Sequence, residues 1–145
     1  MQISEVLGVK SASDIYGVDP DATVAEAVAR MAEHGIGSLV VVKDGTLVGF
    51  ITERDIVRGM HRDSVCLTGY KVSDIMEKEP LVVTPEDSVD YARDAMTKSH
   101  TSHLVVLDGD TLLGVISFHD VARACLKEVN FENALLKRYI KHWPE

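Results

Sequence analysis

Apolar side chains follow a helical period in two segments of the chain. Val24, Ala27, Val28 and Met31 recur at intervals of three and four residues, which places them on one face of an α-helix. Thr23 and Glu26 give this segment a capping-box start, and Gly35 is typical of a helix end. The same pattern returns later in the chain, where the helix is expected to start after Ser88 and to turn three apolar residues inward: Val89, Ala92 and Met96.

After each predicted helix come two short apolar runs. The runs at 39–42 and 47–51 are separated by Asp44-Gly45, and those at 104–107 and 112–116 by a similar turn sequence. Runs of this length, rich in β-branched residues and unbroken by polar positions, are typical of strands buried on both faces. A second helix with apolar residues follows the pair of runs in each half. A short strand is expected before the first helix of each half, at Val18 and at 81–83. The order is therefore β-α-β-β-α in both halves.

The two halves are copies of one unit. Residues 18–58 align with residues 83–123 at a constant offset of 65 without a gap, and 14 of the 41 positions are identical. A shorter echo, Ser13-Asp14-Ile15 and Ser73-Asp74-Ile75, precedes each copy at an offset of 60. We predict an α/β (α+β) fold in which two β-α-β-β-α repeats pack pseudo-symmetrically. The expected divisions are repeat 1 at 8–62, a linker at 63–72, repeat 2 at 73–127 and a C-terminal helical tail at 128–145.

Charge and composition exclude several classes of protein. The chain has 145 residues, 15 Lys and Arg against 23 Asp and Glu, and a net charge of −8, which argues against coating nucleic acid or an anionic membrane. No apolar run approaches the ~20 residues of a membrane helix. We expect no signal peptide, and two cysteines, Cys66 and Cys125, suit a reducing, cytoplasmic location.

At the junction of the second long strand and the second helix, both copies carry Gly-h-h-Ser/Thr-x-x-Asp, in which h is an apolar residue. The segments are Gly49-Phe50-Ile51-Thr52-Glu53-Arg54-Asp55 and Gly114-Val115-Ile116-Ser117-Phe118-His119-Asp120. With the duplication and the preceding Leu-Val-Val strand, the chain resembles a tandem pair of cystathionine-β-synthase (CBS) domains over about residues 8–127. The resemblance implies a regulatory sensor without enzyme activity, which binds AMP, ADP, ATP, NAD or S-adenosylmethionine in clefts between the repeats.

The resemblance also implies which residues bind the nucleotide. Asp55 and Asp120 would hold ribose hydroxyls, and Thr52 and Ser117 would lie near the ribose or phosphate. The residues just before the central strands would line the same clefts: Gly37, Ser38, Ser102 and His103. Apart from the resemblance, Arg54 and His119 stand beside the aspartates at matching positions and offer positive charge to an anion. Some relatives have a basic pair before the central strand, whereas the first copy has Gly37-Ser38 here.

The residues themselves support a ribose and phosphate site. A carboxylate accepts two hydroxyl protons from a vicinal diol, and a helix N-terminus offers N–H groups to a phosphate. The same Ser/Thr-x-x-Asp pattern also caps a helix without any ligand. Both readings hold together, because a capped helix end still offers its carboxylate. Asp120 is the stronger candidate for AMP, because His103 and His119 are expected in its cleft and only Gly37 and Ser38 opposite Asp55.

Two alternatives belong to other classes of function. The module could be a ligand-free interaction scaffold, or a metal- or redox-responsive stress protein that uses His100, His103 and the cysteines. We expect no metal, because only two histidines share a spacing and a metal site needs three or four ligands. The leading hypothesis is an AMP or NAD sensor that acts on an unknown protein partner. AMP and NAD are favoured over ATP because a chain of net charge −8 disfavours four phosphate charges.

We also predict a homodimer. Apolar residues remain on the outer faces of the second helix of each repeat, and such faces commonly form interfaces. The residues are Val57 and Met60 in the first copy and Val121, Ala124 and Cys125 in the second. The apolar residues of the tail, which include Leu135, Leu136 and Trp143, predict an amphipathic helix that docks on its own body or on a dimer mate.

Overall fold

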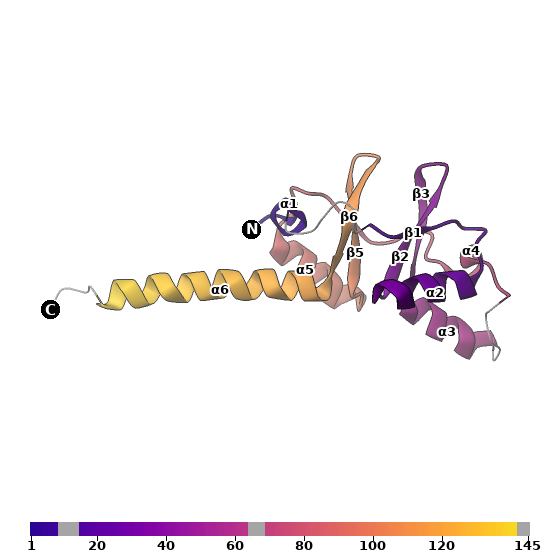
Figure 1. Cartoon of the computed structure of the whole chain (residues 1–145). Helices are drawn as coiled ribbons and strands as arrows, with labels where there is room; N and C mark the ends of the chain where they lie inside the picture. Colours follow the sequence, from indigo (N-terminus) through magenta and orange to yellow (C-terminus); the bar gives the residue numbers. More distant parts are fainter. Residues whose placement is uncertain (9–14, 64–68, 142–145) are drawn as a thin grey trace.

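The order of elements repeats once along the chain (Figure 1). A computed structural model describes residues 1–8, 15–63 and 69–141. Repeat 1 consists of β1 (Gly17–Val18), α2 (Val24–His34), β2 (Ser38–Lys43), β3 (Thr46–Thr52) and α3 (Glu53–Asp63). Repeat 2 consists of β4 (Val82–Val83), α5 (Val89–Ser99), β5 (His103–Asp108), β6 (Thr111–Ser117) and α6 (Phe118–Lys141). Two short helices, α1 (Ile3–Leu7) and α4 (Val72–Ile75), precede the repeats. The predicted fold class and the β-α-β-β-α order are confirmed.

Each repeat has one three-stranded sheet with the same topology. In repeat 1, β1 runs parallel to β2, and β2 is antiparallel to β3 through the turn at Asp44-Gly45. Both turn residues have positive φ, as the tight hairpin requires. Repeat 2 has the equivalent order β4-β5-β6, and both sheets have a register shift at the same place in their central strand. The copies therefore agree even in an irregularity of the backbone.

The central strands are buried on both faces because the two sheets pack against each other. In β2, Leu39 and Val41 face the helices of repeat 1, whereas Val40 points the other way into a third core. This core contains Val40 and Phe50 of repeat 1 and Val105 of repeat 2. The central strands β2 and β5 therefore need apolar residues at consecutive positions, which is the pattern that the sequence shows. This shared core fixes the two repeats side by side.

Both first helices begin with the predicted caps. Thr23 Oγ1 accepts a hydrogen bond from the N–H of Glu26 at 3.1 Å, and Ser88 Oγ accepts one from Tyr91 at 3.0 Å. The helix ends differ between the repeats: α2 ends at Gly35 with φ +62°, and α5 ends at His100 with φ +53°. A histidine thus occupies a left-handed position that normally favours glycine.

The short helices α1 and α4 are exchanged between the repeats. The helix α4 precedes repeat 2 but packs on repeat 1, where Val72 N–H donates to the carbonyl of Ala22 at 2.8 Å. In the same way, α1 precedes repeat 1 but packs on repeat 2, where Ile3 N–H donates to the backbone carbonyl of Asp87 at 2.9 Å. The structural counterpart of Ser73-Asp74-Ile75 is therefore Ser4-Glu5-Val6, at an offset of 69. The echo at an offset of 60 therefore does not mark the structural counterpart of α4, and its residues 13 and 14 lie outside the described residues.

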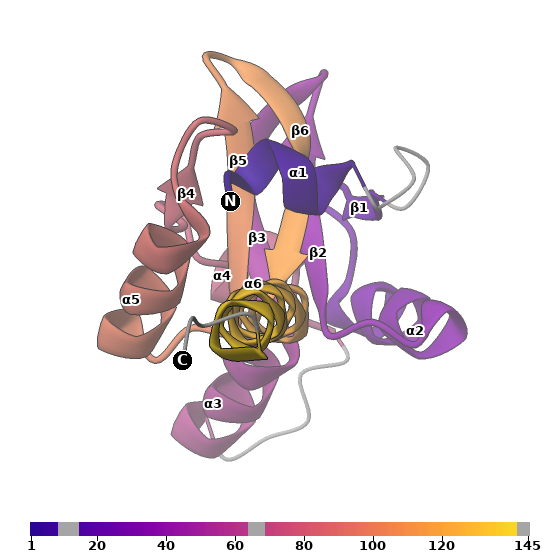
Figure 2. The ribbon, with the colours of Figure 1, turned by 90° about the vertical axis from the view of Figure 1, so that its left-hand side faces the viewer.

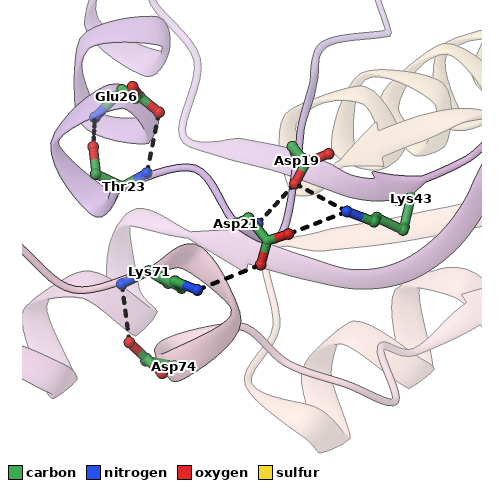
Figure 3. A network of polar contacts seen from close by, with 7 residues as sticks. All are labelled: Asp19, Asp21, Thr23, Glu26, Lys43, Lys71 and Asp74. Atoms are coloured by element: carbon green, nitrogen blue, oxygen red, sulfur yellow. Dashed lines mark hydrogen bonds and ion pairs between the residues drawn. The ribbon is translucent and has the colours of Figure 1, made fainter.

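A network of charges ties α4 to repeat 1 (Figure 3). The carboxylate of Asp21 lies between two lysines, 3.1 Å from Lys43 Nζ and 3.7 Å from Lys71 Nζ. Lys71 directly precedes α4, and its N–H donates to Asp74 at 2.9 Å. The hydrogen bond from Lys43 is the main reason that the pKa of Asp21 lies below its ordinary value, with Lys71 adding to the effect.

The helix α6 continues without a break from repeat 2 into the predicted tail, and it projects from repeat 2 on the side away from repeat 1 (Figures 1 and 2). Its first turns are covered within the same chain: Val121 and Ala124 are buried, and Cys125 packs against the core of repeat 2. These three residues were predicted to form an interface, and that prediction was wrong because α1 and α5 already cover this part of α6. Val57 and Met60 on α3 are exposed, as expected.

Candidate functional site

Two cavities lie between the repeats, and each takes residues from both of them. The first, called here the Asp55 cleft, has a volume of about 180 Å³. Repeat 1 supplies the junction of β3 and α3, and the loop between α5 and β5 comes from repeat 2. Among its lining residues are Phe50, Thr52, Arg54, Asp55, Arg58, Glu77, Pro80, Leu81, His100, Ser102 and His103.

The second cavity, called here the Asp120 cleft, lies by the junction of β6 and α6. It has a volume of about 260 Å³ and is lined by Ile15, Tyr16, Gly35, Ile36, Gly37, Ser38, His103, Val115 and Ser117. Among the described residues of its lining there is no Arg, Lys, Asp or Glu. Gly37 and His103 line both cavities, so the two clefts adjoin. The two related clefts therefore differ in charge.

The strand-to-helix junctions position the two aspartates by the same capping geometry. Asp55 Oδ2 accepts hydrogen bonds from Thr52 N–H at 2.9 Å and from Thr52 Oγ1 at 3.0 Å, and Asp55 N–H donates back to Oγ1 at 3.2 Å. Ser117 and Asp120 repeat this arrangement with nearly the same distances. The capping interpretation of the motif is confirmed in both copies.

The second carboxylate oxygen distinguishes the two aspartates. Asp120 Oδ1 accepts a hydrogen bond from Arg123 at 3.2 Å, and the side chain of Asp120 is only 9% exposed. Within the described part of the chain, Asp55 Oδ1 has no such donor, and Asp55 is half-buried in the wall of its cleft. Asp55 can therefore cap its helix with one oxygen and accept a ligand hydroxyl with the other.

A hydrogen bond crosses the Asp55 cleft from one repeat to the other. The Arg54 guanidinium, which lies at the start of α3, donates to the backbone carbonyl of His100 at the end of α5. Beside it, the His103 ring meets Phe50 edge to face, with ring centroids 6.3 Å apart. The cleft thus combines an apolar wall (Phe50, Pro80 and Leu81) with cationic groups and a carboxylate.

The structure agrees only in part with the expected pairing of loops and aspartates. His100 and Ser102 line the Asp55 cleft and Ser38 lines the Asp120 cleft, whereas Gly37 and His103 line both. His103 was predicted near Asp120, and it does line that cleft, but it lines the Asp55 cleft as well. Asp120 and His119 are not among the described residues that line either cleft, so the argument that favoured Asp120 loses its basis.

Of the ten predicted site residues, eight line one of the two clefts. His119 and Asp120 do not: His119 is exposed on α6, and Asp120 is bonded to its own helix end. Sequence reasoning left out several residues of the Asp55 cleft, including Phe50, Glu77, Pro80 and Leu81. Arg58, which follows Asp55 by almost one helical turn, also lines this cleft. Pro80 and Leu81 carry no comparable signal, because only the packing of the repeats brings them there.

The described part of the chain has neither a cluster of metal ligands nor a membrane-spanning helix. In residues 1–8, 15–63 and 69–141, no three His, Cys, Asp or Glu side chains converge in a group that could hold a metal ion. His100 and His103 both lie in the Asp55 cleft, and Cys66 lies outside the described residues. No helix in those same ranges combines the length and the apolar character needed to cross a bilayer.

The fold and its shared clefts define a tandem α/β repeat module, and comparison with known proteins gives its family. The family model "CBS domain" matches residues 4–62 and 72–127. The mitochondrial CBS domain-containing protein CBSX3 from Arabidopsis thaliana is 39% identical over 126 residues, which cover 83% of this chain and 61% of that protein. The chain belongs to the CBS domain family.

Solved structures agree with this assignment. A protein with CBS domains from Burkholderia ambifaria MC40-6 superposes with a TM-score of 0.82 at 33% identity, covering 88% of this chain and 95% of that one. The hexameric CBS-CP12 protein from bloom-forming cyanobacteria superposes with a TM-score of 0.72 at 29% identity, covering 84% and 69%. CBS pairs are generally regulatory modules that often bind adenine nucleotides, and they are often oligomeric.

Proposed function

We propose that this chain is a regulatory module that binds AMP, or a related adenine nucleotide such as NAD, in the Asp55 cleft and acts on a separate protein. One observation carries the proposal: the cleft has three kinds of surface, one for each part of a nucleoside monophosphate. Phe50, Pro80 and Leu81 form a wall for the base, the carboxylate of Asp55 suits the ribose diol, and two guanidiniums suit the phosphate.

Binding requires a movement of Arg54. The cavity of about 180 Å³ is below the ~300 Å³ at which small-molecule sites usually begin, and Arg54 spans it to the carbonyl of His100. We expect a nucleotide phosphate to take this guanidinium from the carbonyl, since a charged acceptor makes the stronger hydrogen bond. The ligand would then replace the hydrogen bond between Arg54 and His100 that links the two repeats. Through this change, ligand binding in the cleft would alter the contact between the repeats.

The charges of the cleft favour ligands with few phosphates. Three carboxylates, those of Glu53, Asp55 and Glu77, line it together with the guanidiniums of Arg54 and Arg58. AMP carries less charge than ATP and so meets less repulsion from these carboxylates. The described residues that line the Asp120 cleft include no Arg or Lys, which makes it the weaker candidate for a phosphate.

Calorimetric titration with AMP, NAD and ATP tests this function. Asp55→Ala removes two charge-assisted hydrogen bonds to the diol, on the order of 3 kcal/mol, and should weaken AMP binding more than a hundredfold. Asp120→Ala is the matched control: it removes the same motif residue from repeat 2 and should leave AMP affinity within a few fold. Equal affinity of the wild type and Asp55→Ala, or ATP binding tenfold tighter than AMP, would contradict the proposal.

A ligand-free scaffold is the second candidate, and the bond between Arg54 and His100 favours it because the cleft is already bridged. Thermal-shift measurements with AMP, ATP, NAD and S-adenosylmethionine distinguish the two functions, since a bound ligand raises the melting temperature by mass action. A scaffold predicts no shift with any of the four ligands.

A further inference from the structure

An apolar groove in repeat 1 lies open between two helices. It has a volume of about 500 Å³, and α2 contributes Val28, Met31 and Ala32, while α3 contributes Ile56 and Val57. Val28 is 45% exposed and Val57 is 64% exposed. Repeat 1 alone therefore leaves a row of apolar side chains in contact with water along this groove.

The equivalent helices of repeat 2 lie closer together. There, α5 packs directly against α6, whereas α2 and α3, both fully described, share no comparable contact (Figure 2). At the offset of 65, Val28 corresponds to Arg93 and Ala32 to Thr97, so the outer residues are also polar. The open apolar groove is thus a property of repeat 1 and not a general feature of the repeat.

The same molecule has an exposed apolar helix face at its other end. All residues of α6 from 129 to 141, called here the arm, are exposed, including Val129, Leu136 and Ile140 at 50%, 58% and 70%. Together with Leu135, these residues cover more than a third of the helix circumference at 3.6 residues per turn. A two-stranded coiled coil needs only a narrow seam, whereas a face this wide suits a groove with two walls.

The arm cannot fill the groove of its own chain. It is about 20 Å long at 1.5 Å per residue, and α6 runs straight from repeat 2 on the side away from repeat 1 (Figure 1). Residues 1–128 hold twelve Lys and Arg against twenty-one Asp and Glu, and residues 129–145 hold three against two. The arm is thus the slightly basic part of an acidic chain, so the body of a second copy attracts it.

We infer that the arm of a second copy of this chain occupies the groove between α2 and α3, and that the exchange is reciprocal. Each copy has one arm on repeat 2 and one groove on repeat 1. In a dimer with a two-fold axis, the arm of each copy fills the groove of the other, so no arm or groove is left free and the assembly is closed. Repeat 2 of each chain then lies against repeat 1 of its partner. This inference does not depend on nucleotide binding.

Light scattering of the full-length chain with single substitutions tests the exchange. The wild type should have twice the chain mass of 15.9 kDa. Leu136→Asp in the arm and Val57→Asp in the groove should each give monomers, because each buries a charge in both contacts of the dimer. Both positions are exposed in the single chain, so circular dichroism should show an unchanged fold. Asn130→Asp, which adds the same charge on the polar face of the arm, is the control and should remain dimeric.

An equimolar mixture of the two variants gives the sharpest outcome. A mixed dimer has one contact in which neither residue is altered, since the intact arm of Val57→Asp meets the intact groove of Leu136→Asp. Mixing should therefore restore dimers that neither variant forms alone. The exchange would be overturned by a monomeric wild type, by an assembly larger than two chains, or by a mixture that stays monomeric. It would also be overturned by a dimer that survives Val57→Asp, which would mean that two arms pair with each other. A dimer that survives Leu136→Asp would overturn it as well, because two grooves would then pair.

Discussion

The two repeats share their interior and differ at their cleft-facing loops. The apolar positions of the central strands match residue for residue, and both sheets have the same register shift. At the clefts, however, Gly35 corresponds to His100 and Ser38 to His103, and Arg54 of the Asp55 cleft corresponds to His119, which lines neither cleft. Core positions are restrained by close packing on both sides, whereas positions at the edge of a cleft can change without a cost in buried area.

This difference separates the roles of the two copies. Repeat 2 contributes the imidazoles of the Asp55 cleft, and repeat 1 contributes the guanidiniums and the carboxylate. The described residues that repeat 1 contributes to the Asp120 cleft are uncharged, and repeat 2 adds His103, Val115 and Ser117. A duplicated fold thus provides two related clefts, of which one has the charged groups that a phosphate needs.

The largest effect on stability is expected at paired glycines. A Cβ at Gly49 would lie 2.6 Å from Met76 Sδ and 2.9 Å from the carbonyl oxygen of Glu77, whose backbone is held by two hydrogen bonds to Phe50. A Cβ at Gly114 would meet only the Leu7 side chain, at 3.1 Å. Gly49→Ala should therefore cost about 2 to 3 kcal/mol of unfolding free energy, and Gly114→Ala about 1 kcal/mol or less.

Urea denaturation of the two glycine variants measures this difference. The slope of the unfolding free energy against urea concentration should stay constant, and only the midpoint should move. Equal losses in both variants would show that the exchanged helices α1 and α4 constrain their repeats to the same degree.

A smaller effect of opposite sign is expected at the ends of α2 and α5. Gly35→Ala places a side chain in the left-handed region and should cost about 1 kcal/mol, whereas His100→Gly relieves the same strain and should stabilise by up to about 1 kcal/mol. If the imidazole contributes to the cleft, His100→Gly should also weaken AMP binding. Thermal unfolding and calorimetric titration on the same samples measure both quantities, and a loss of stability in His100→Gly would contradict the strain argument.

The smallest effect concerns the charge network of repeat 1. The pKa of Asp21 in the folded chain lies below the ordinary value of 3.8, mainly because of the hydrogen bond from Lys43. Its contribution to stability is therefore present above pH 3.8 and is lost as the pH falls through the lower folded value. Asp21→Asn should lower the melting temperature slightly at neutral pH, and the gap to the wild type should close in acid.

Glu86→Gln is the control for Asp21→Asn. Glu86 is the counterpart of Asp21 in repeat 2, where Asp108 replaces Lys43, so the equivalent ion pair cannot form. This variant should show no acid-dependent difference from the wild type. The same pH dependence in both variants would assign the effect to general charge repulsion.

The sequence predicted the repeats from their self-similarity at a constant offset, and it predicted the six strands and the caps of the first helices from local patterns. Thr23 with Glu26 and the apolar run of β2 are signals of this kind. The exchange of α1 and α4 was not predicted, because a helix of four residues such as Val72–Ile75 carries no signal of the repeat on which it packs. The echo at an offset of 60 does not relate α4 to α1 either.

The site was predicted less completely than the fold. The Ser/Thr-x-x-Asp motif located Thr52 and Asp55 correctly, since the capping geometry is local. Which loop lies opposite depends on how the two sheets pack, and no short pattern in the sequence contains that information. His100 and Arg54 come together only through this packing, 46 residues apart along the chain.

The exchanged helices α1 and α4 have a consequence for the origin of the molecule. A single repeat on its own would carry a short helix that fits another copy and not itself, so two separate single-repeat chains would have to assemble by swapping these helices. Joining the two copies in one polypeptide makes the swap intramolecular and replaces dependence on protein concentration with a fixed local concentration. Gene duplication would thereby have freed each copy to change its loops, since the pairing no longer required two identical surfaces.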